Sequence, residues 1–156
     1  MFDKVDFGAD LLGDSPLFNG LGDTEIGGLL ECAQIHQFDD GQVVVEQGSQ
    51  GDAIFLLYDG TLSVGTLDAQ GRSIELARID QSGAFFGEIA LVDPGPRSAT
   101  VRASGEAVLL SLTLDDLGSF FERFDKTEAV VLRNIARVLA RRLRDSNALV
   151  SSLSSS

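Results

Sequence analysis

Residues 86–101 read Phe86-Gly-Glu-Ile-Ala-Leu-Val-Asp-Pro-Gly-Pro-Arg-Ser-Ala-Thr-Val101, a segment with the groups of an anion-binding loop. Gly87 allows a ligand close to the backbone, and Glu88–Leu91 can form one helical turn whose unpaired N–H groups point at an anion. The Pro-Gly-Pro run at 94–96 indicates a turn back toward Gly87. The segment therefore predicts a short helix and a turn that present Arg97, a planar charged fork for phosphate oxygens.

These residue types suit a sugar phosphate with a single negative charge. We expect Glu88 to accept the proton of a ribose 2′-hydroxyl. Arg97 and the backbone amides of Ser98 and Ala99 would bind the phosphate. The sugar keeps the carboxylate and the phosphate apart. The segment thus predicts a site for a ribose cyclic phosphate.

Two motifs, taken in order, resemble the cyclic nucleotide-binding domain family. One is the family's phosphate-binding cassette, Phe86–Leu91 followed after a gap of five residues by Arg97–Val101, with no departure from the family pattern. The other lies upstream, in Val44–Gly48 and Gly51–Leu57, where only Ser49 between them is less usual. Two long motifs in the right order are far more specific than a lone glycine motif, and the resemblance covers most of the chain.

The resemblance implies that the cassette holds the sugar and phosphate, while the last helix contributes to the base site. In the family's bacterial activators, residues just after the counterpart of Arg141-Arg142-Leu143 reach the purine base. Those positions hold Ser146 and Asn147 here, and both side chains can hydrogen-bond to a base edge. The residues expected to contact the ligand are Phe86, Gly87, Glu88, Ile89, Ala90, Leu91, Arg97, Ser98, Ala99, Thr100, Ser146 and Asn147.

The expected ligand is cAMP or cGMP, with no cofactor and no metal ion. A serine directly after the cassette arginine is similar to the bacterial cAMP activators, which favours cAMP. Relatives selective for cGMP often place a threonine there, to bond the guanine amino group. Ser98 can serve that purpose too, so cGMP stays open, as do pyrimidine cyclic nucleotides.

Composition agrees with one compact domain. The chain has 156 residues, of which 44% are hydrophobic, enough to bury a core without disulfides. Its net charge of −12 argues against broad attraction to nucleic acid or anionic membranes. Cys32 is the only cysteine, and neither a signal pattern nor a membrane-spanning apolar run is visible. We therefore expect a cytoplasmic protein that binds neither DNA nor membrane.

The middle of the chain predicts a mainly β fold with flanking helices. Short β-rich runs are separated by turns such as Asp59-Gly60, a pattern typical of a sandwich or roll of about eight strands. This matches the jelly roll of the family, with the cassette helix inserted in the β-roll. The expected strands are Gln42–Glu46, Ile54–Tyr58, Thr61–Thr66, Ser73–Ile79, Thr100–Arg102 and Ala107–Leu112.

Helices are expected on both sides of the roll. Asp23–Cys32 has apolar residues at helical spacing. Thr113 and Asp116 form a capping-box pattern ahead of a helix whose phenylalanines pack on the roll, and a longer helix follows from about Thr127. The whole chain is then one domain, 1–156, with helices in 1–35, the roll in 36–112 with its cassette at 86–101, and two C-terminal helices in 113–153.

The last helix predicts a homodimer. Apolar residues recur at steps of three and four or their multiples, with Arg142 and Ser146 in the same phase, which resembles a dimer seam. No helix-turn-helix pattern follows Leu153, so we expect action through a partner protein or through the ligand alone. Five arginines on this helix are interpreted as a solvated face in preference to a nucleic-acid or phospholipid face. The seam residues are Leu132, Ile135, Leu139, Arg142, Ser146, Leu149 and Leu153.

The expected function is a cyclic nucleotide sensor that rearranges its C-terminal helix to signal to an effector protein. Two alternatives stay open, a ligand-independent dimeric scaffold with a degenerate pocket and a regulatory subunit of a separately encoded enzyme. An enzyme is not expected, because the nucleophile, phosphate-loop and paired-metal motifs are absent. Cys32 and His36, taken as i,i+4 neighbours at a helix end, are interpreted as ordinary structure.

Overall fold

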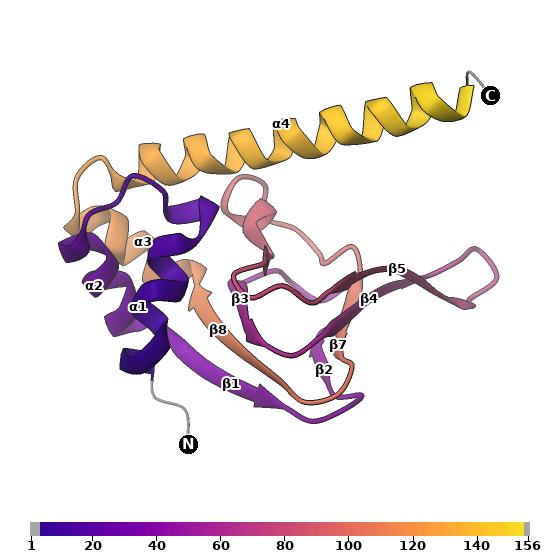
Figure 1. Ribbon diagram of the computed structural model, residues 1–156, viewed down its shortest axis with the longest axis horizontal. Coiled ribbons are helices and arrows are strands. Elements are labelled where there is room, and N and C mark those ends of the chain that lie inside the picture. The colour runs from indigo at the N-terminus through magenta and orange to yellow at the C-terminus, as the bar shows by residue number, and fades with distance from the viewer. Residues whose placement is uncertain (1–3, 155–156) are drawn as a thin grey trace.

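A computed structural model describes residues 4–154, in which helices cover one side of an antiparallel β-roll (Figure 1). Three helical segments precede the roll: α1 (Lys4–Asp14), the 3₁₀ turn η1 (Pro16–Phe18) and α2 (Asp23–Cys32). Two helices follow it, α3 (Leu114–Arg123) and α4 (Thr127–Ser154). α4 runs across the roll, and its C-terminal half stands apart from the strands (Figure 1). No helix within the described residues is both long and apolar enough to cross a membrane.

The roll consists of two four-stranded antiparallel sheets, with strand orders β1-β8-β3-β6 and β2-β7-β4-β5. A 3₁₀ turn, η2 (Glu88–Leu91), interrupts the strands. The predicted β-roll of about eight strands with flanking helices and a cassette helix is therefore confirmed. The strands are β1 Gln34–Phe38, β2 Val43–Val45, β3 Ala53–Asp59, β4 Leu62–Leu67, β5 Ser73–Ile79, β6 Phe85–Phe86, β7 Thr100–Ala103 and β8 Ala107–Thr113.

The sequence located most of these elements but missed three. The bounds expected for α2 and β5 are those of the structure, and the other five expected strands differ from it by one residue at one or both ends. α1, β1 and β6 were not predicted. β1 alternates polar and apolar residues only weakly, and β6 has two residues, which is too short for a periodicity.

β3 lies at the centre because both of its faces are buried. Ile54 and Leu56 belong to a core shared with the helices, whereas Phe55 and Leu57 belong to a second core inside the roll. All four are less than 10% exposed. An uninterrupted apolar run is the pattern expected of a strand covered on both sides.

α4 divides into an anchored half and a projecting half. Val131 and Ile135 are buried, and the Asn134 side chain donates hydrogen bonds of 2.9 Å to the carbonyls of Leu17 and Asn19. Residues 141–153 are exposed throughout. The first half is thus fixed to η1 and the loop after it, while the second half extends from the body.

This division corrects the expected dimer seam. Ile135 is 1% exposed because it packs into the core of its own chain, so it is not available to a partner. Leu139 also packs partly against that core. Leu132, Leu149 and Leu153 are exposed, as expected of a pairing face.

The expected helical relation between Cys32 and His36 is wrong. Cys32 ends α2, whereas His36 lies in β1. His36 Nε2 lies 2.7 Å from Ser111 Oγ on β8, and its ring lies near those of Phe38 and Phe55. Partial burial lowers the pKa of His36, because desolvation disfavours the imidazolium.

This pKa shift predicts a stability change in mild acid. Between the lowered pKa and the ordinary value of 6.5, the unfolded chain binds a proton that the folded chain does not. The free energy of unfolding should therefore decrease as the pH falls below 6.5. Urea unfolding at pH 7.5 and 5.5 should show a smaller decrease in His36→Gln than in the wild type. Equal decreases in both proteins would contradict this assignment.

Candidate functional site

Gly87, the residue directly after β6, has a left-handed backbone conformation. Gly87 has φ +89° and precedes η2 (Glu88–Leu91). A Cβ added here would lie 2.6 Å from the carbonyl oxygen of Ala53 and 2.7 Å from Nη1 of Arg97. Glycine is therefore required both by the conformation and by the close approach of the arginine fork.

The upstream motif holds the other arm of the cassette. Arg97 N–H donates to the carbonyl of Ser49 at 2.7 Å, and Gly48 N–H donates to the carbonyl of Arg97 at 2.8 Å. Gly51 N–H donates to the carbonyl of Gly95 at 3.1 Å. The two motifs found in the sequence thus form one hydrogen-bonded unit, which fixes the backbone at Arg97.

The Arg97 guanidinium is largely buried. Its side chain is 9% exposed, and Nη2 donates to the carbonyl of Ala53 at 3.1 Å. The guanidinium carbon lies 5.8 Å from the centre of the Phe55 ring. Burial lowers the pKa of Arg97, although the nearby Asp52 opposes that shift.

Arg97 has only a weak carboxylate partner. Asp52 Oδ1 lies 3.9 Å from Nη2 and is the one carboxylate oxygen recorded within 4.0 Å among the described side chains. The Asp52 side chain is 84% exposed, so solvent screens its charge. A buried cation in this setting favours an anionic ligand.

Glu88 differs from Arg97, because an arginine from a distant part of the chain neutralises its charge. Its side chain is 3% exposed, and Oε1 accepts a hydrogen bond from Arg142 Nη1 at 2.5 Å. Arg142 lies on α4, 54 positions away, and its guanidinium carbon lies 5.8 Å from the centre of the Phe85 ring. The cassette is therefore linked directly to the last helix.

The remaining cassette residues have mainly structural contacts. Phe86 stacks on Phe55 with ring centres 5.1 Å apart, and Leu91 packs against the core shared with the helices. The Thr100 hydroxyl accepts a hydrogen bond from Gln47 N–H at 2.9 Å. Of the other expected site residues, Ala90 is buried, Ala99 is half-buried, and Ile89 and Ser98 are exposed.

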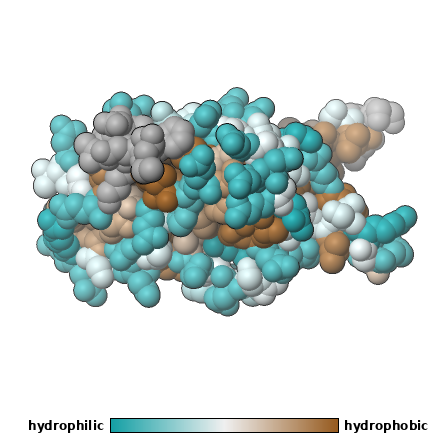
Figure 2. All heavy atoms as spheres, turned by 90° about the horizontal axis from the view of Figure 1, so that it is seen from below, coloured by the Kyte–Doolittle hydropathy of each residue, from teal (hydrophilic) through white to brown (hydrophobic). Residues whose placement is uncertain are grey.

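The structure does not bring the two expected base contacts to the cassette. Ser146 and Asn147 are exposed on the projecting half of α4, beyond Arg142. In Figure 2, the end of α4 and the β4–β5 hairpin form two separate projections, each with hydrophobic surface. The exposed large apolar residues on the hairpin and on the projecting half of α4 are Leu67, Ile74, Leu76, Leu143, Leu149, Val150 and Leu153.

Sequence reasoning missed the ion pair of Glu88 with Arg142. Arg142 was assigned to a dimer seam by its helical phase, and nothing in the spacing of two residues 54 positions apart indicates a contact. It also missed Asp52 and Phe55, which flank the Arg97 guanidinium. The sequence offers no signal for the contact of Glu88 with Arg142 beyond the five arginines of the last helix.

A cavity of about 580 Å³ lies away from these charged groups. It is bounded by α1 and residues 81–85 and shares only Phe85 with the surroundings of Arg142. Neither Glu88 nor Arg97 lines it. The site is therefore assigned from the charged groups of the cassette and not from the size of a cavity.

Comparison with known proteins agrees with this geometry. The family model "cyclic nucleotide-binding domain" matches residues 35–124, from β1 to the end of α3. The "cyclic AMP receptor protein" of Thermus thermophilus is 33% identical over 133 residues, which are 85% of this chain and 59% of that protein. The "cAMP-dependent protein kinase type II regulatory subunit" of Drosophila melanogaster is 29% identical over 81% of this chain and 32% of that protein.

A solved structure shares the fold over nearly the whole chain. The N-terminal domain of a transcriptional regulator from Streptomyces coelicolor aligns with a TM-score of 0.75 and 30% identity. The alignment covers 90% of this chain and 95% of that one. The chain is thus similar to a complete domain of that structure and to only part of each curated relative.

The cassette glycine provides a direct test of this geometry. Gly87→Ala should lower the free energy of unfolding by at least about 1–2 kcal/mol, because a Cβ is disfavoured in the left-handed region and meets the Ala53 carbonyl. Gly95→Ala is the matched control, because nothing lies within 4 Å of its Cβ position. Chemical denaturation of both variants measures the difference. Equal stability of the two variants would show that Gly87 is not constrained in this way.

Proposed function

Because the chain belongs to the cyclic nucleotide-binding domain family, we propose that its cassette binds a cyclic nucleotide. The observation that carries this proposal is the Arg97 guanidinium, which is 9% exposed with its nearest carboxylate at 3.9 Å. A phosphate is the ligand group that a planar charged fork binds best. The left-handed Gly87 beside it leaves the backbone open to close approach.

In this proposal the cassette reads the sugar and the phosphate. Arg97 and the amides of Ser98 and Ala99 bind the phosphate, and Glu88 accepts the ribose 2′-hydroxyl. The bottom of the pocket is formed by Phe86, Gly87 and the 3₁₀ turn with Ile89, Ala90 and Leu91. Thr100 borders the pocket on the side of β7. Within one chain, Ser146 and Asn147 reach the base only if the projecting half of α4 moves toward the cassette.

We favour cAMP over cGMP as the ligand. The names of the Thermus receptor protein and the Drosophila kinase subunit both refer to cyclic AMP. Ser98 follows the cassette arginine, where a threonine would favour cGMP. The choice of base depends on the final helix and therefore on its position.

The proposed output is a movement of α4. Arg142 binds Oε1 of Glu88, so a ribose hydroxyl on the same carboxylate changes the environment of that ion pair. A ligand that binds one arrangement of cassette and helix more tightly shifts the population toward it. The projecting half of α4 then presents a different surface to an effector protein. In this reading the chain senses a ligand and carries out no catalysis, and its cytosolic location stays a prediction.

We further propose that α4 pairs with a second copy along a revised seam. Leu132, Leu143 and Val150 are 37%, 62% and 60% exposed. With Ala129, Ala136, Leu139, Ser146 and Leu153 they occupy alternate steps of three and four residues, which is the heptad pattern of a coiled coil. This seam leaves Ile135 in its own core.

One observation favours a ligand-independent scaffold as the second candidate. Arg142 neutralises the buried carboxylate of Glu88 from within the chain, as expected if the pocket has lost its ligand. Such a scaffold keeps the fold and the dimer and binds no ligand. Arg97 argues against it, because no comparable contact from a described side chain neutralises that guanidinium.

Isothermal titration of ligand-stripped protein with cAMP and cGMP distinguishes the two candidates. The sensor predicts micromolar or tighter binding, with cAMP ahead of cGMP. Arg97→Ala should weaken it by about tenfold to a hundredfold, since a hydrogen bond to a charged group contributes roughly 1.5–3 kcal/mol. Arg102→Ala is the matched control, because Arg102 is exposed and donates only to the Gly41 carbonyl.

Each result decides between the candidates. Binding that survives in Arg97→Ala would remove Arg97 from the phosphate site. No heat with either nucleotide, and no nucleotide found by mass spectrometry in the purified protein, would establish the scaffold.

A further inference from the structure

Four arginines form a row along α4, apart from the arginine that contacts Glu88. They lie at i, i+4, i+8 and i+11, which places them on one face of the helix over about 16 Å. All four are exposed, and none has a recorded ion pair among the described side chains. This arginine row consists of Arg133, Arg137, Arg141 and Arg144.

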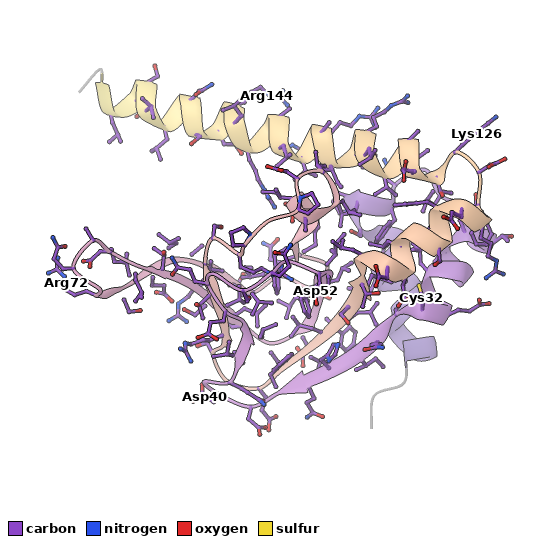
Figure 3. The ribbon with its side chains drawn as sticks, turned by 180° about the vertical axis from the view of Figure 1, so that it is seen from behind. Cys32, Asp40, Asp52, Arg72, Lys126 and Arg144 are labelled. Carbon is purple, nitrogen blue, oxygen red and sulfur yellow. The ribbon has the colours of Figure 1, made fainter. Side chains whose placement is uncertain are left out.

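The arginine row faces away from the protein body. Val131 and Ile135 mark the buried face of the helix, and the row lies roughly opposite to them by helical phase. Figure 3 shows Arg144 on the side of α4 that points away from the roll. The heptad seam proposed for a second copy lies about 135° around the helix from the row, so pairing along that seam leaves the row open.

Unlike the arginine row, the other exposed arginines have acidic partners, except for Arg102, which donates to the Gly41 carbonyl. Arg72, Arg78 and Arg123 each have a carboxylate within 4.0 Å. Along the row, the positions three or four residues away hold arginine or uncharged residues, except for Asp145, which follows Arg141 at i+4. Like charges at this spacing destabilise a helix. The chain has 24 acidic residues against 12 basic ones, so unpaired arginines here are not a consequence of a shortage of acids.

We propose that the arginine row is a docking surface for an acidic helical segment of a partner protein. Guanidinium forks bind carboxylates in two-point contacts, and a helix with acidic residues at the same spacing matches the row in length and charge. Extended polyanions fit less well, because the rest of the chain is strongly acidic and the net charge is −12. A short acidic helix interacts only with the arginine row. The acidic residues elsewhere on the chain repel it little, because charges more than about 8–10 Å away are screened at physiological salt.

This inference deepens the proposed function by naming the chemistry of the effector, but the docking itself does not need a nucleotide. The arginine row begins on the anchored half of α4 and ends two residues after Arg142. A partner on the row therefore contacts both the fixed and the projecting parts of the helix. Movement of α4 at Glu88 changes what that partner touches.

The test uses fluorescence anisotropy with a labelled helical peptide that carries glutamates at i, i+4, i+8 and i+11. A peptide with glutamines at these positions is the control ligand. The protein without nucleotide should bind the glutamate peptide, the affinity should fall as salt rises, and the glutamine peptide should bind about tenfold or more weakly. The assay contains no nucleotide, so a wrong assignment of the cassette cannot cause a loss of peptide binding.

Two quadruple variants make the test specific to the arginine row. R133Q/R137Q/R141Q/R144Q should weaken peptide binding about tenfold or more, while R72Q/R78Q/R102Q/R123Q, with the same change in net charge, should bind like the wild type. Equal losses in the two variants, or equal binding of the two peptides, would overturn the proposal. Tighter binding at the row by single-stranded DNA or by vesicles with anionic lipids would replace it with a nucleic-acid or membrane surface.

Discussion

The buried carboxylate of Glu88 is the constraint on which the arrangement of this protein depends. A carboxylate that is 2% exposed needs a cation within hydrogen-bond distance, and removing the partner of a buried charge typically costs about 3–5 kcal/mol. Arg142 meets that need from α4, across 54 positions of sequence. The cassette and the last helix therefore cannot be placed independently, and a change at one is a change at the other.

Arg97 is the other buried charge of the site, and unlike Glu88 it has no close partner of opposite charge among the described residues. The loop at Ser49 fixes its backbone and Phe55 supports its guanidinium, yet its nearest carboxylate is exposed and at 3.9 Å. One charge of the cassette is thus paired within the protein, and the other is positioned for an anion. A cyclic nucleotide offers a phosphate to the second and a hydroxyl to the first, so its binding involves both the roll and α4.

The sequence predicted the parts of this site that are local and missed those that are not. Gly87, the turn at Glu88–Leu91 and the position of Arg97 follow from residue types in one segment, and the roll follows from short periodic strands. The contact of Arg142 with Glu88 depends on where a distant helix lies, which no spacing encodes. Ile135 shows the same limit, because helical phase alone cannot distinguish a face buried in its own core from a face that pairs with a second copy.

The most direct test of the link between nucleotide and helix is a distance between cassette and α4 with and without cAMP. Spin labels at Val92→Cys and Ala148→Cys, in a Cys32→Ser background, allow it to be measured by double electron–electron resonance, with labelled protein diluted into unlabelled protein. We expect cAMP to shift the distance distribution and Arg142→Gln to abolish the shift while cAMP still binds. An unchanged distribution in wild-type protein saturated with cAMP would contradict this expectation.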